Sequence, residues 1–299
     1  METNFLILRD GKKVRTGRWS LPGGGRGTIV ILHGRSEFLE KYQETADDLL
    51  ARGFGVFSFD WRGQGLSDRV LPERQKGHID DFEIWVADLD EILALAAPPG
   101  PIVLLGHSMG GHLALRFMAE HPGRADAAIL TAPMIDILPG AFARWTTRTA
   151  AALAVRRGLS TRYAPGHGDY DPSAHRFEGN RLTSDPARFE VHRAAFRERP
   201  ELRLGGVTWG WLDASFRSTT ILRDPTYAGG IDRPVLLLSA GIERLVSNAA
   251  QHEVAKALPL GTIRTYTEAL HEILMERDTI RNRFWSDFDT FLGDNRILA

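Results

Sequence analysis

Cysteine is absent from this chain of 299 residues, and its absence excludes several kinds of chemistry. A chain without cysteine forms no disulfide, offers no thiol nucleophile and cannot build a metal site on thiolate ligands. This composition is compatible with a reducing cytosol and does not prove one.

Long uncharged apolar runs are also missing, and none approaches the ~20 residues that a membrane-spanning helix needs. The first residues, METNFLILRDGKK (1–13), place an acidic residue before a short apolar run and basic residues after it. This order is the reverse of that in a secretory signal. We therefore expect a cytoplasmic protein and leave open a peripheral contact with the inner membrane surface.

Neither sign of charge is in excess, because 37 lysines and arginines stand against 38 acidic residues, for a formal net charge of -1. Such a chain has no overall field that would recruit nucleic acid, so we expect no nucleic-acid partner. Hydrophobic residues make up 43% of the chain, as in an ordinary globular protein. Composition alone predicts neither a partner nor an oligomeric state, and both must be argued from individual sites.

Strand-like and helix-like segments alternate along most of the chain. Helical spacing of apolar residues covers 38–53, 79–99 and 112–123. Short apolar runs typical of strands occur at 4–8, 28–33, 55–60, 101–106, 127–132, 234–240 and 262–267. The alternation predicts an α/β fold with a mostly parallel central sheet flanked by helices on both faces.

The alternation lapses between residues 134 and 230, where tryptophan, arginine and proline are frequent. We expect this segment to be an inserted cap (lid) subdomain, and residues 1–133 and 231–299 to form the core. The segment is mildly basic, with 14 arginines, no lysine and 10 acidic residues. A solvated surface explains most imbalances of this kind, and contact with an anionic head group is the alternative.

The segment IVLLGHSMGGH (102–112) leads from an apolar strand into an amphipathic helix through the pattern G-x-S-x-G. In this pattern the serine lies at a sharp strand-to-helix turn, and glycines two places before and after it keep Cβ atoms out of a crowded corner. A serine hydroxyl is a poor nucleophile until a base activates it. Ser108 is thus the candidate nucleophile, and the alternative is a serine that caps a helix in a glycine-rich turn.

A nucleophilic serine needs a base and a carboxylate that orients the base, and with this motif the acid precedes the histidine in the chain. His271 lies in the loop after the strand-like run 262–267, where the base is expected. Glu243 is the first carboxylate after the preceding strand-like run. We predict these two residues as base and acid. The alternatives are a surface loop histidine and a solvated carboxylate paired with Arg244.

Two backbone N–H groups are expected to stabilise the negative charge that forms during acyl transfer. One belongs to Met109, the residue after the nucleophile, and the other to Arg35, which follows Gly34 at the end of the strand 28–33. The glycine-rich turn that begins at Asp60 lacks the lysine and the spacing of a phosphate-binding loop, so we assign it a structural role. No motif with metal-ligand spacing is present, and the sequence indicates neither a metal nor a cofactor.

These segments resemble the α/β-hydrolases, and within them the branch of the lysophospholipase L2 proteins and monoacylglycerol lipases, often labelled serine aminopeptidase-like. The resemblance covers nearly the whole chain. It is carried in the core by HGRSEFLEKY (33–42), FDWRGQGLSD (59–68), GHSMGG (106–111), AGIERLVSNAAQ (240–251) and LHEILMERD (270–278), and in the insertion by NRLTSDPARF (180–189) and TWGWLDAS (208–215). It implies an α/β-hydrolase fold with an inserted cap, Ser108 as nucleophile, His271 as base and Glu243 as acid. Much of the branch has aspartate where Glu243 stands.

The resemblance also implies a cofactor-independent serine ester hydrolase that cleaves the carboxylic esters of single-chain lipids through an acyl-enzyme intermediate. Aromatic residues of the insertion are candidates to line the acyl site, or else they form the cap's own core: Phe142, Trp145, Trp209, Trp211 and Phe216. Three other hypotheses keep the fold, namely a short-chain carboxylesterase, a peptidase and a non-catalytic ligand binder.

Overall fold

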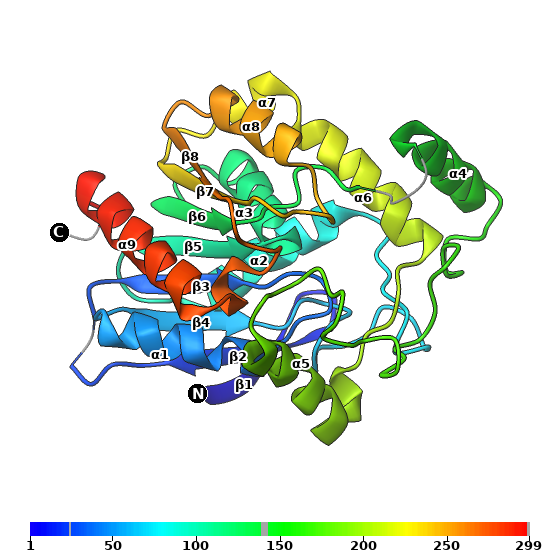
Figure 1. Cartoon of the computed structure of the whole chain (residues 1–299), viewed down its shortest axis with the longest axis horizontal. Coiled ribbons are helices and arrows are strands. Elements are labelled where there is room, and N and C mark those ends of the chain that lie inside the picture. Colours follow the sequence, from blue (N-terminus) through cyan, green and yellow to red (C-terminus); the bar gives the residue numbers. More distant parts are fainter. Residues whose placement is uncertain (24, 139–142, 298–299) are drawn as a thin grey trace.

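The centre of the computed structural model, which describes residues 1–23, 25–138 and 143–297, is one mixed β-sheet (Figure 1). Within the described residues, eight strands lie in the order β1-β2-β4-β3-β5-β6-β7-β8. β2 pairs antiparallel with both β1 and β4, and the remaining neighbours are parallel. The strands are β1 (Glu2–Ile7), β2 (Lys13–Trp19), β3 (Thr28–Leu32), β4 (Gly55–Phe59), β5 (Ile102–His107), β6 (Ala127–Thr131), β7 (Val235–Ala240) and β8 (Gly261–Tyr266).

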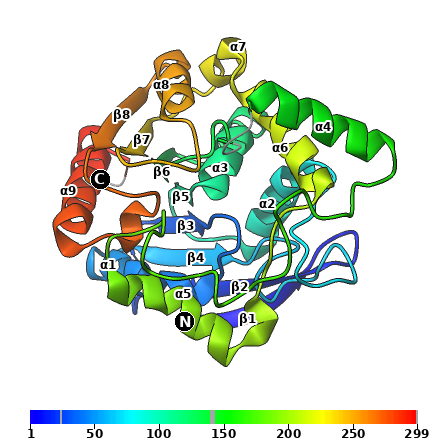
Figure 2. The same ribbon diagram turned by 45° about the vertical axis from the view of Figure 1, so that its right-hand side comes forward.

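Helices cover both faces of this sheet (Figures 1 and 2). Ile29 and Ile31 of β3 pack on the face of α1 and α9, whereas Val30 and Leu32 pack on the face of α2, α3 and α8. Neighbouring residues thus alternate between two apolar cores, as expected for a strand buried on both sides. These helices are α1 (Gln43–Ala51), α2 (Phe82–Ala96), α3 (Met109–Glu120), α8 (Asn248–Ala257) and α9 (Asp278–Asp294), with short 3-10 helices η1 (Leu39–Tyr42) and η3 (Ile273–Met275).

The seven strands expected from the sequence are present, and the prediction of a mostly parallel sheet with helices on both faces is confirmed. Strand β2 was not predicted, because a buried arginine interrupts its apolar pattern. The Arg15 guanidinium lies 2.7 Å from Asp60 and 2.7 Å from Glu40, and these ion pairs let it occupy a buried position. The contact also ties the turn at Asp60 to the sheet, in keeping with the structural role expected of that turn.

Between β6 and β7 the chain leaves the sheet and returns to it. In the described part of this segment the helices are α4 (Arg144–Arg156), α5 (Pro186–Glu198), η2 (Pro200–Leu202), α6 (Trp209–Leu222) and α7 (Pro225–Gly229). α6 packs against α2 and α3, α4 packs on α6 away from the sheet, and α5 lies against η1 (Figure 1). Among the helices of the described residues, none has both the length and the apolar character needed to cross a bilayer.

Candidate active site

The candidate nucleophile lies where β5 ends and α3 begins. Ser108 has φ 51° and ψ -115°, a backbone conformation that residues other than glycine seldom adopt. Its N–H donates to the Thr131 carbonyl (3.0 Å), and its own carbonyl accepts from the N–H groups of Met134 (2.9 Å) and His112 (3.1 Å). These bonds hold a strained turn whose cost is on the order of 1–3 kcal/mol. Met109 follows as the first residue of α3, so its N–H has no acceptor within the helix.

Two glycines of the motif are required by the close packing of this turn. A Cβ atom on Gly110 would overlap the carbonyl oxygen of Leu32, and one on Gly106 would lie 2.7 Å from the Cα of Gly111. Both obstacles are backbone atoms, so a side chain at either position would displace the strand or the helix. The G-x-S-x-G pattern therefore has a steric cause in this fold.

The three residues predicted as nucleophile, base and acid lie in hydrogen-bond contact. Nε2 of His271 is 2.9 Å from Ser108 Oγ, and Nδ1 is 2.6 Å from Glu243 Oε2. Because Nδ1–H donates to the carboxylate, Nε2 keeps a lone pair that accepts the hydroxyl proton of Ser108. The histidine ring and the carboxylate are both buried, which keeps water from competing for these bonds.

Backbone N–H groups hold the Glu243 carboxylate in one orientation. Its Oε1 accepts from Arg244 (2.8 Å), Leu245 (2.7 Å) and Val246 (3.4 Å), which leaves Oε2 for His271. Burial alone would raise the pKa of Glu243, but the hydrogen bond and charge of His271, together with the backbone donors, hold this pKa below its ordinary value. The loop thus restrains the additional rotatable bond that distinguishes glutamate from aspartate.

The loop after β3 leaves one amide without a partner. The Gly34 N–H donates to Glu37 Oε2 (2.5 Å), and the Ser36 N–H donates to Gln64 Oε1 (2.5 Å). Between them, the Arg35 N–H has no acceptor in the part of the chain that the structure describes. The N–H groups of Arg35 and of Met109, the first residue of α3, are therefore free to donate hydrogen bonds to a developing oxyanion, and this role stays a prediction.

The insertion contacts the loop that carries the candidate base. The N–H of Glu272 donates to the Leu182 carbonyl (2.7 Å), and the hydroxyl of Thr183 donates to the Met275 carbonyl (2.5 Å). The segment 180–189, one of the two insertion segments that carry the family resemblance, thus lies directly against this loop. These hydrogen bonds tether the loop of the candidate base to the insertion.

The five aromatic residues proposed to line an acyl site occupy different environments. Phe142 lies outside the described residues. Trp145 is 70% exposed on α4, and Trp209 is partly buried at the start of α6. Trp211 and Phe216 are buried, and Trp211 packs against Phe82 of α2 in the apolar core that the insertion shares with the sheet, so the acyl-site role of both stays a prediction. For Trp209 the acyl-site role stays a prediction.

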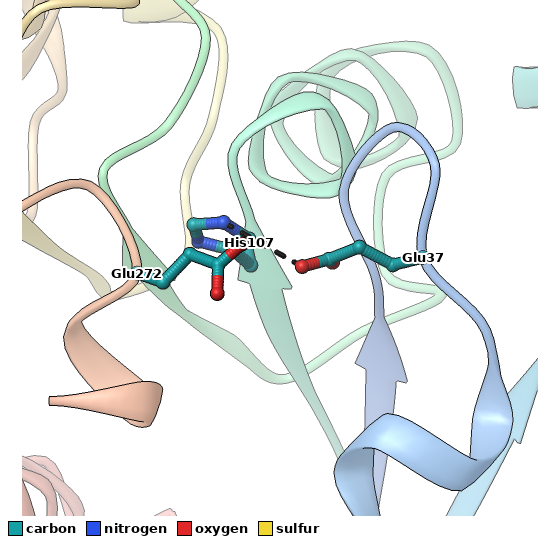
Figure 3. A group of neighbouring side chains, drawn as sticks. All are labelled: Glu37, His107 and Glu272. Carbon is teal, nitrogen blue, oxygen red and sulfur yellow. Dashed lines mark ion pairs between the residues drawn. The ribbon is translucent and has the colours of Figure 1, made fainter. Parts of the chain in front are cut away.

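A group of buried ionisable residues beside the candidate triad was not singled out from the sequence. Glu37, His107 and Glu272 each offer a ligand atom within 4.8 Å of the others, as a metal site would (Figure 3). The Lys41 ammonium, however, lies 2.5 Å from Glu37 and 2.8 Å from Glu272. A lysine already supplies the cation, so this set of donors does not fit a resident metal. Glu37 precedes η1, so its spacing from Lys41 is not a helical pair, and no pattern in the sequence indicated this contact.

The chain is similar to known proteins over most of its length. The profile of the family described as "Serine aminopeptidase, S33" matches residues 24–278. Lysophospholipase L2 of Escherichia coli (strain K12) is 36% identical over 273 residues, which cover 85% of this chain and 76% of that protein. A probable lysophospholipase L2 of Haemophilus influenzae is 30% identical, with 90% of this chain and 84% of the other covered.

The fold itself matches solved structures. A soluble variant of monoglyceride lipase from Saccharomyces cerevisiae, in complex with a substrate analog, superposes with a TM-score of 0.76 at 22% identity. The match covers 98% of this chain and 94% of the other. At this identity the likeness shows the fold alone, and the expected α/β-hydrolase fold is confirmed.

Proposed function

Since the chain belongs to the serine aminopeptidase, S33, family, we propose that it is a serine hydrolase that cleaves the carboxylic esters of single-chain lipids. In this proposal Ser108 is the nucleophile, His271 is the base and Glu243 orients the base. The backbone amides of Arg35 and Met109 form the oxyanion hole.

The reaction runs through an acyl-enzyme. Oγ of Ser108 attacks the ester carbonyl carbon while Nε2 of His271 takes the hydroxyl proton. The tetrahedral oxyanion collapses, the bond to the alcohol breaks, and the alcohol leaves with the proton from Nε2. Water then gives a proton to Nε2 as its oxygen adds to the acyl carbon, and the fatty acid leaves as Oγ regains that proton. Neither half of the reaction requires a metal or a cofactor.

The observation that carries this proposal is the continuous pair of hydrogen bonds from Ser108 to His271 (2.9 Å) and from His271 to Glu243 (2.6 Å). A protein that only bound a ligand would have no need of a serine held at positive φ against an oriented histidine. The geometry therefore favours an enzyme over a non-catalytic binder on the same fold.

Single-chain lipid esters are the proposed substrate class because the two relatives described above carry the names lysophospholipase L2 and probable lysophospholipase L2. A short-chain carboxylic ester is the second candidate substrate, since the same triad chemistry acts on both. The length of the acyl chain that is preferred separates the two candidates.

We further propose that residues 134–230 form a cap over this site and that residues 1–133 and 231–299 form the core. Two contacts support this division. The Leu182 carbonyl accepts a hydrogen bond from the N–H of Glu272, the residue after the base (2.7 Å). The Gly205 carbonyl accepts one from the Arg35 guanidinium (2.9 Å). A segment that rests on both the base loop and the oxyanion loop is placed to enclose an acyl chain, which needs an apolar wall.

One helix of this segment is suited to peripheral contact with lipid. On α4, Trp145 and Leu153 are exposed (70% and 44%), and Arg148 and Arg156 fall on the same side of the helix. Exposed aromatic and cationic side chains favour the interface of an anionic bilayer. Co-sedimentation with phosphatidylglycerol vesicles tests this contact: Trp145→Ala should lower the bound fraction, and equal binding of variant and wild type would exclude contact through α4.

The experiment that tests the proposed function is hydrolysis of a lysophosphatidylcholine, a monoacylglycerol of the same acyl chain and a short acyl ester. Wild type is compared with Ser108→Ala, which should lose at least about 10³-fold in turnover. Ser286→Ala, which removes an exposed hydroxyl of α9, is the matched control and should behave as wild type.

The outcomes separate the candidates. Cleavage of the long-chain lipid esters by wild type alone supports the lipid hydrolase, and the ratio of the two head groups identifies the preferred substrate. Cleavage of only the short ester supports the carboxylesterase. Equal activity of wild type and Ser108→Ala, or no activity on any ester, rules the proposal out.

A further inference from the structure

A buried lysine connects the two loops that carry the oxyanion amide and the candidate base. Lys41 is 3% exposed, and its ammonium lies 2.5 Å from Glu37 Oε1 and 2.8 Å from Glu272 Oε1. Burial opposes its charge, but the carboxylates of Glu272 and Glu37 raise the pKa of Lys41 above its ordinary value, so it stays protonated. A buried charge is costly unless it is paired, so the fold depends on this arrangement.

Each of the two carboxylates is attached to one side of the candidate active site. Oε2 of Glu37 accepts from the Gly34 N–H (2.5 Å), directly before the Arg35 amide, and from the Tyr42 hydroxyl (2.8 Å). Glu272 is the residue that follows the base in the chain. An ion pair to each carboxylate therefore joins the oxyanion loop, which follows β3, to the base loop, which follows β8.

His107, at the end of β5, completes this buried group (Figure 3). Its Nδ1 lies 3.1 Å from the Thr131 carbonyl oxygen, and its ring packs edge-on against that of His271 with the centroids 4.9 Å apart. Burial lowers the pKa of His107 to about 3, so the ring is neutral and contributes packing. Within the described residues, the ionic connection between the two loops thus runs through Lys41.

We infer that the Lys41–Glu272 ion pair positions the two loops of the proposed hydrolase and sets the spacing between the Arg35 amide and Nε2 of His271. The inference rests on the proposed function. One ester carbonyl must be within reach of the nucleophile, the oxyanion amide and the base at once, so a shift of about 1 Å costs on the order of 10²-fold in rate. The pair acts through the loops, so its loss lowers kcat and leaves KM nearly unchanged.

Glu272→Ala cuts the connection with the least disturbance, because Lys41 and Glu37 still neutralise each other. Glu272→Gln is the matched variant, since its side-chain carbonyl still accepts a hydrogen bond from the ammonium. If Glu272→Ala does not fold, Lys41→Met cuts the same connection from its other end. These substitutions leave Ser108 unchanged.

Arg62→Met is the control for the loss of a partly buried ion pair elsewhere. The Arg62 guanidinium lies 2.7 Å from Asp88 and also contacts Asp10, so it bridges two carboxylates as Lys41 does. It belongs to neither loop of the candidate site. Arg62→Met should therefore lower the melting temperature, as the loss of an ion pair does, while kcat stays close to that of wild type.

The readouts are the rate at which an alkyl fluorophosphonate labels Ser108, kcat and KM on a short acyl ester, and the melting temperature. The labelling reaction uses the nucleophile, the base and the oxyanion hole, but not the natural substrate. Glu272→Ala should lower the labelling rate and kcat by about 10- to 100-fold while KM changes by less than about threefold. Glu272→Gln should lie between this variant and wild type.

Two results would overturn the inference: a folded Glu272→Ala with kcat within about twofold of wild type, or the same loss of kcat in Arg62→Met. The first shows that the connection is dispensable, and the second that general stability is responsible. A loss in Glu272→Gln as large as that in Glu272→Ala would support the ion pair, because it shows that the charge of Glu272 is required. If wild type cleaves no ester, the proposed function fails while the labelling rates still test the ion pair. A wild type that is not labelled overturns both.

Discussion

Glutamine in place of Glu243 tests how the candidate triad holds its proton. Three backbone N–H groups of the residues that follow lie 2.7 to 3.4 Å from Oε1, so the carbonyl oxygen of a glutamine must stay at that position. The NH2 group then faces Nδ1 of His271, where a carboxylate oxygen now lies 2.6 Å away. Nδ1 becomes an acceptor, the ring proton moves to Nε2, and Nε2 no longer accepts from Ser108.

The loss expected from this wrong tautomer is roughly 10³- to 10⁴-fold in kcat. It corresponds to about 4 to 5.5 kcal/mol of transition-state stabilisation. The assay is steady-state hydrolysis of the best ester substrate by wild type, Glu243→Gln and Glu268→Gln. The last variant removes the same charge from an exposed residue of the β8–base loop, and it should retain wild-type turnover.

The reasoning is refuted if Glu243→Gln retains more than about a tenth of the wild-type kcat. That result would mean that another group orients the histidine, or that the glutamine amide turns over despite three backbone donors. A melting temperature close to that of wild type is required for either conclusion, since the substitution preserves the shape of the side chain.

Three further predictions follow from the same contacts. Gly110→Ala should lower the free energy of unfolding by about 3 kcal/mol or more, because the added Cβ overlaps the Leu32 carbonyl oxygen. Gly293→Ala on α9, where the added Cβ has no neighbour within 4 Å from another part of the described chain, is the control and should leave the free energy of unfolding unchanged or slightly higher. Urea denaturation measures both variants. Because the pKa of Glu243 is lowered in the folded protein, its ionised form stabilises the fold above the ordinary pKa of glutamate. This stabilisation is lost as the pH falls through the folded-state pKa. The difference in unfolding free energy between wild type and Glu243→Gln should therefore shrink from about pH 7 to about pH 3. A difference that grows on acidification would contradict this sign. Trp209→Ala should weaken hydrolysis of long-chain esters more than that of short ones, and equal losses in kcat/KM would remove this residue from the acyl site.

Much of the fold and the core of the candidate site were predictable because they depend on local pattern. Apolar runs marked the strands, the G-x-S-x-G spacing marked the turn at Ser108, and chain order led to His271 and Glu243. The first two signals are local in the chain, and the third combines chain order with the position of each residue directly after a strand-like run. Such signals arise from the backbone geometry of strands and turns, which neighbouring residues impose on one another.

The tertiary structure decided how charges are buried. Strand β2 could not be predicted from its apolar pattern, because the charged Arg15 lies in it. The partners that allow Arg15 to be buried, Glu40 and Asp60, lie 25 and 45 residues away in the chain. Lys41 is a plain polar residue in the sequence until the fold brings Glu272 to its ammonium. A charged side chain enters a protein interior only beside a partner, and the chain's covalent order does not specify which partner the fold will place there.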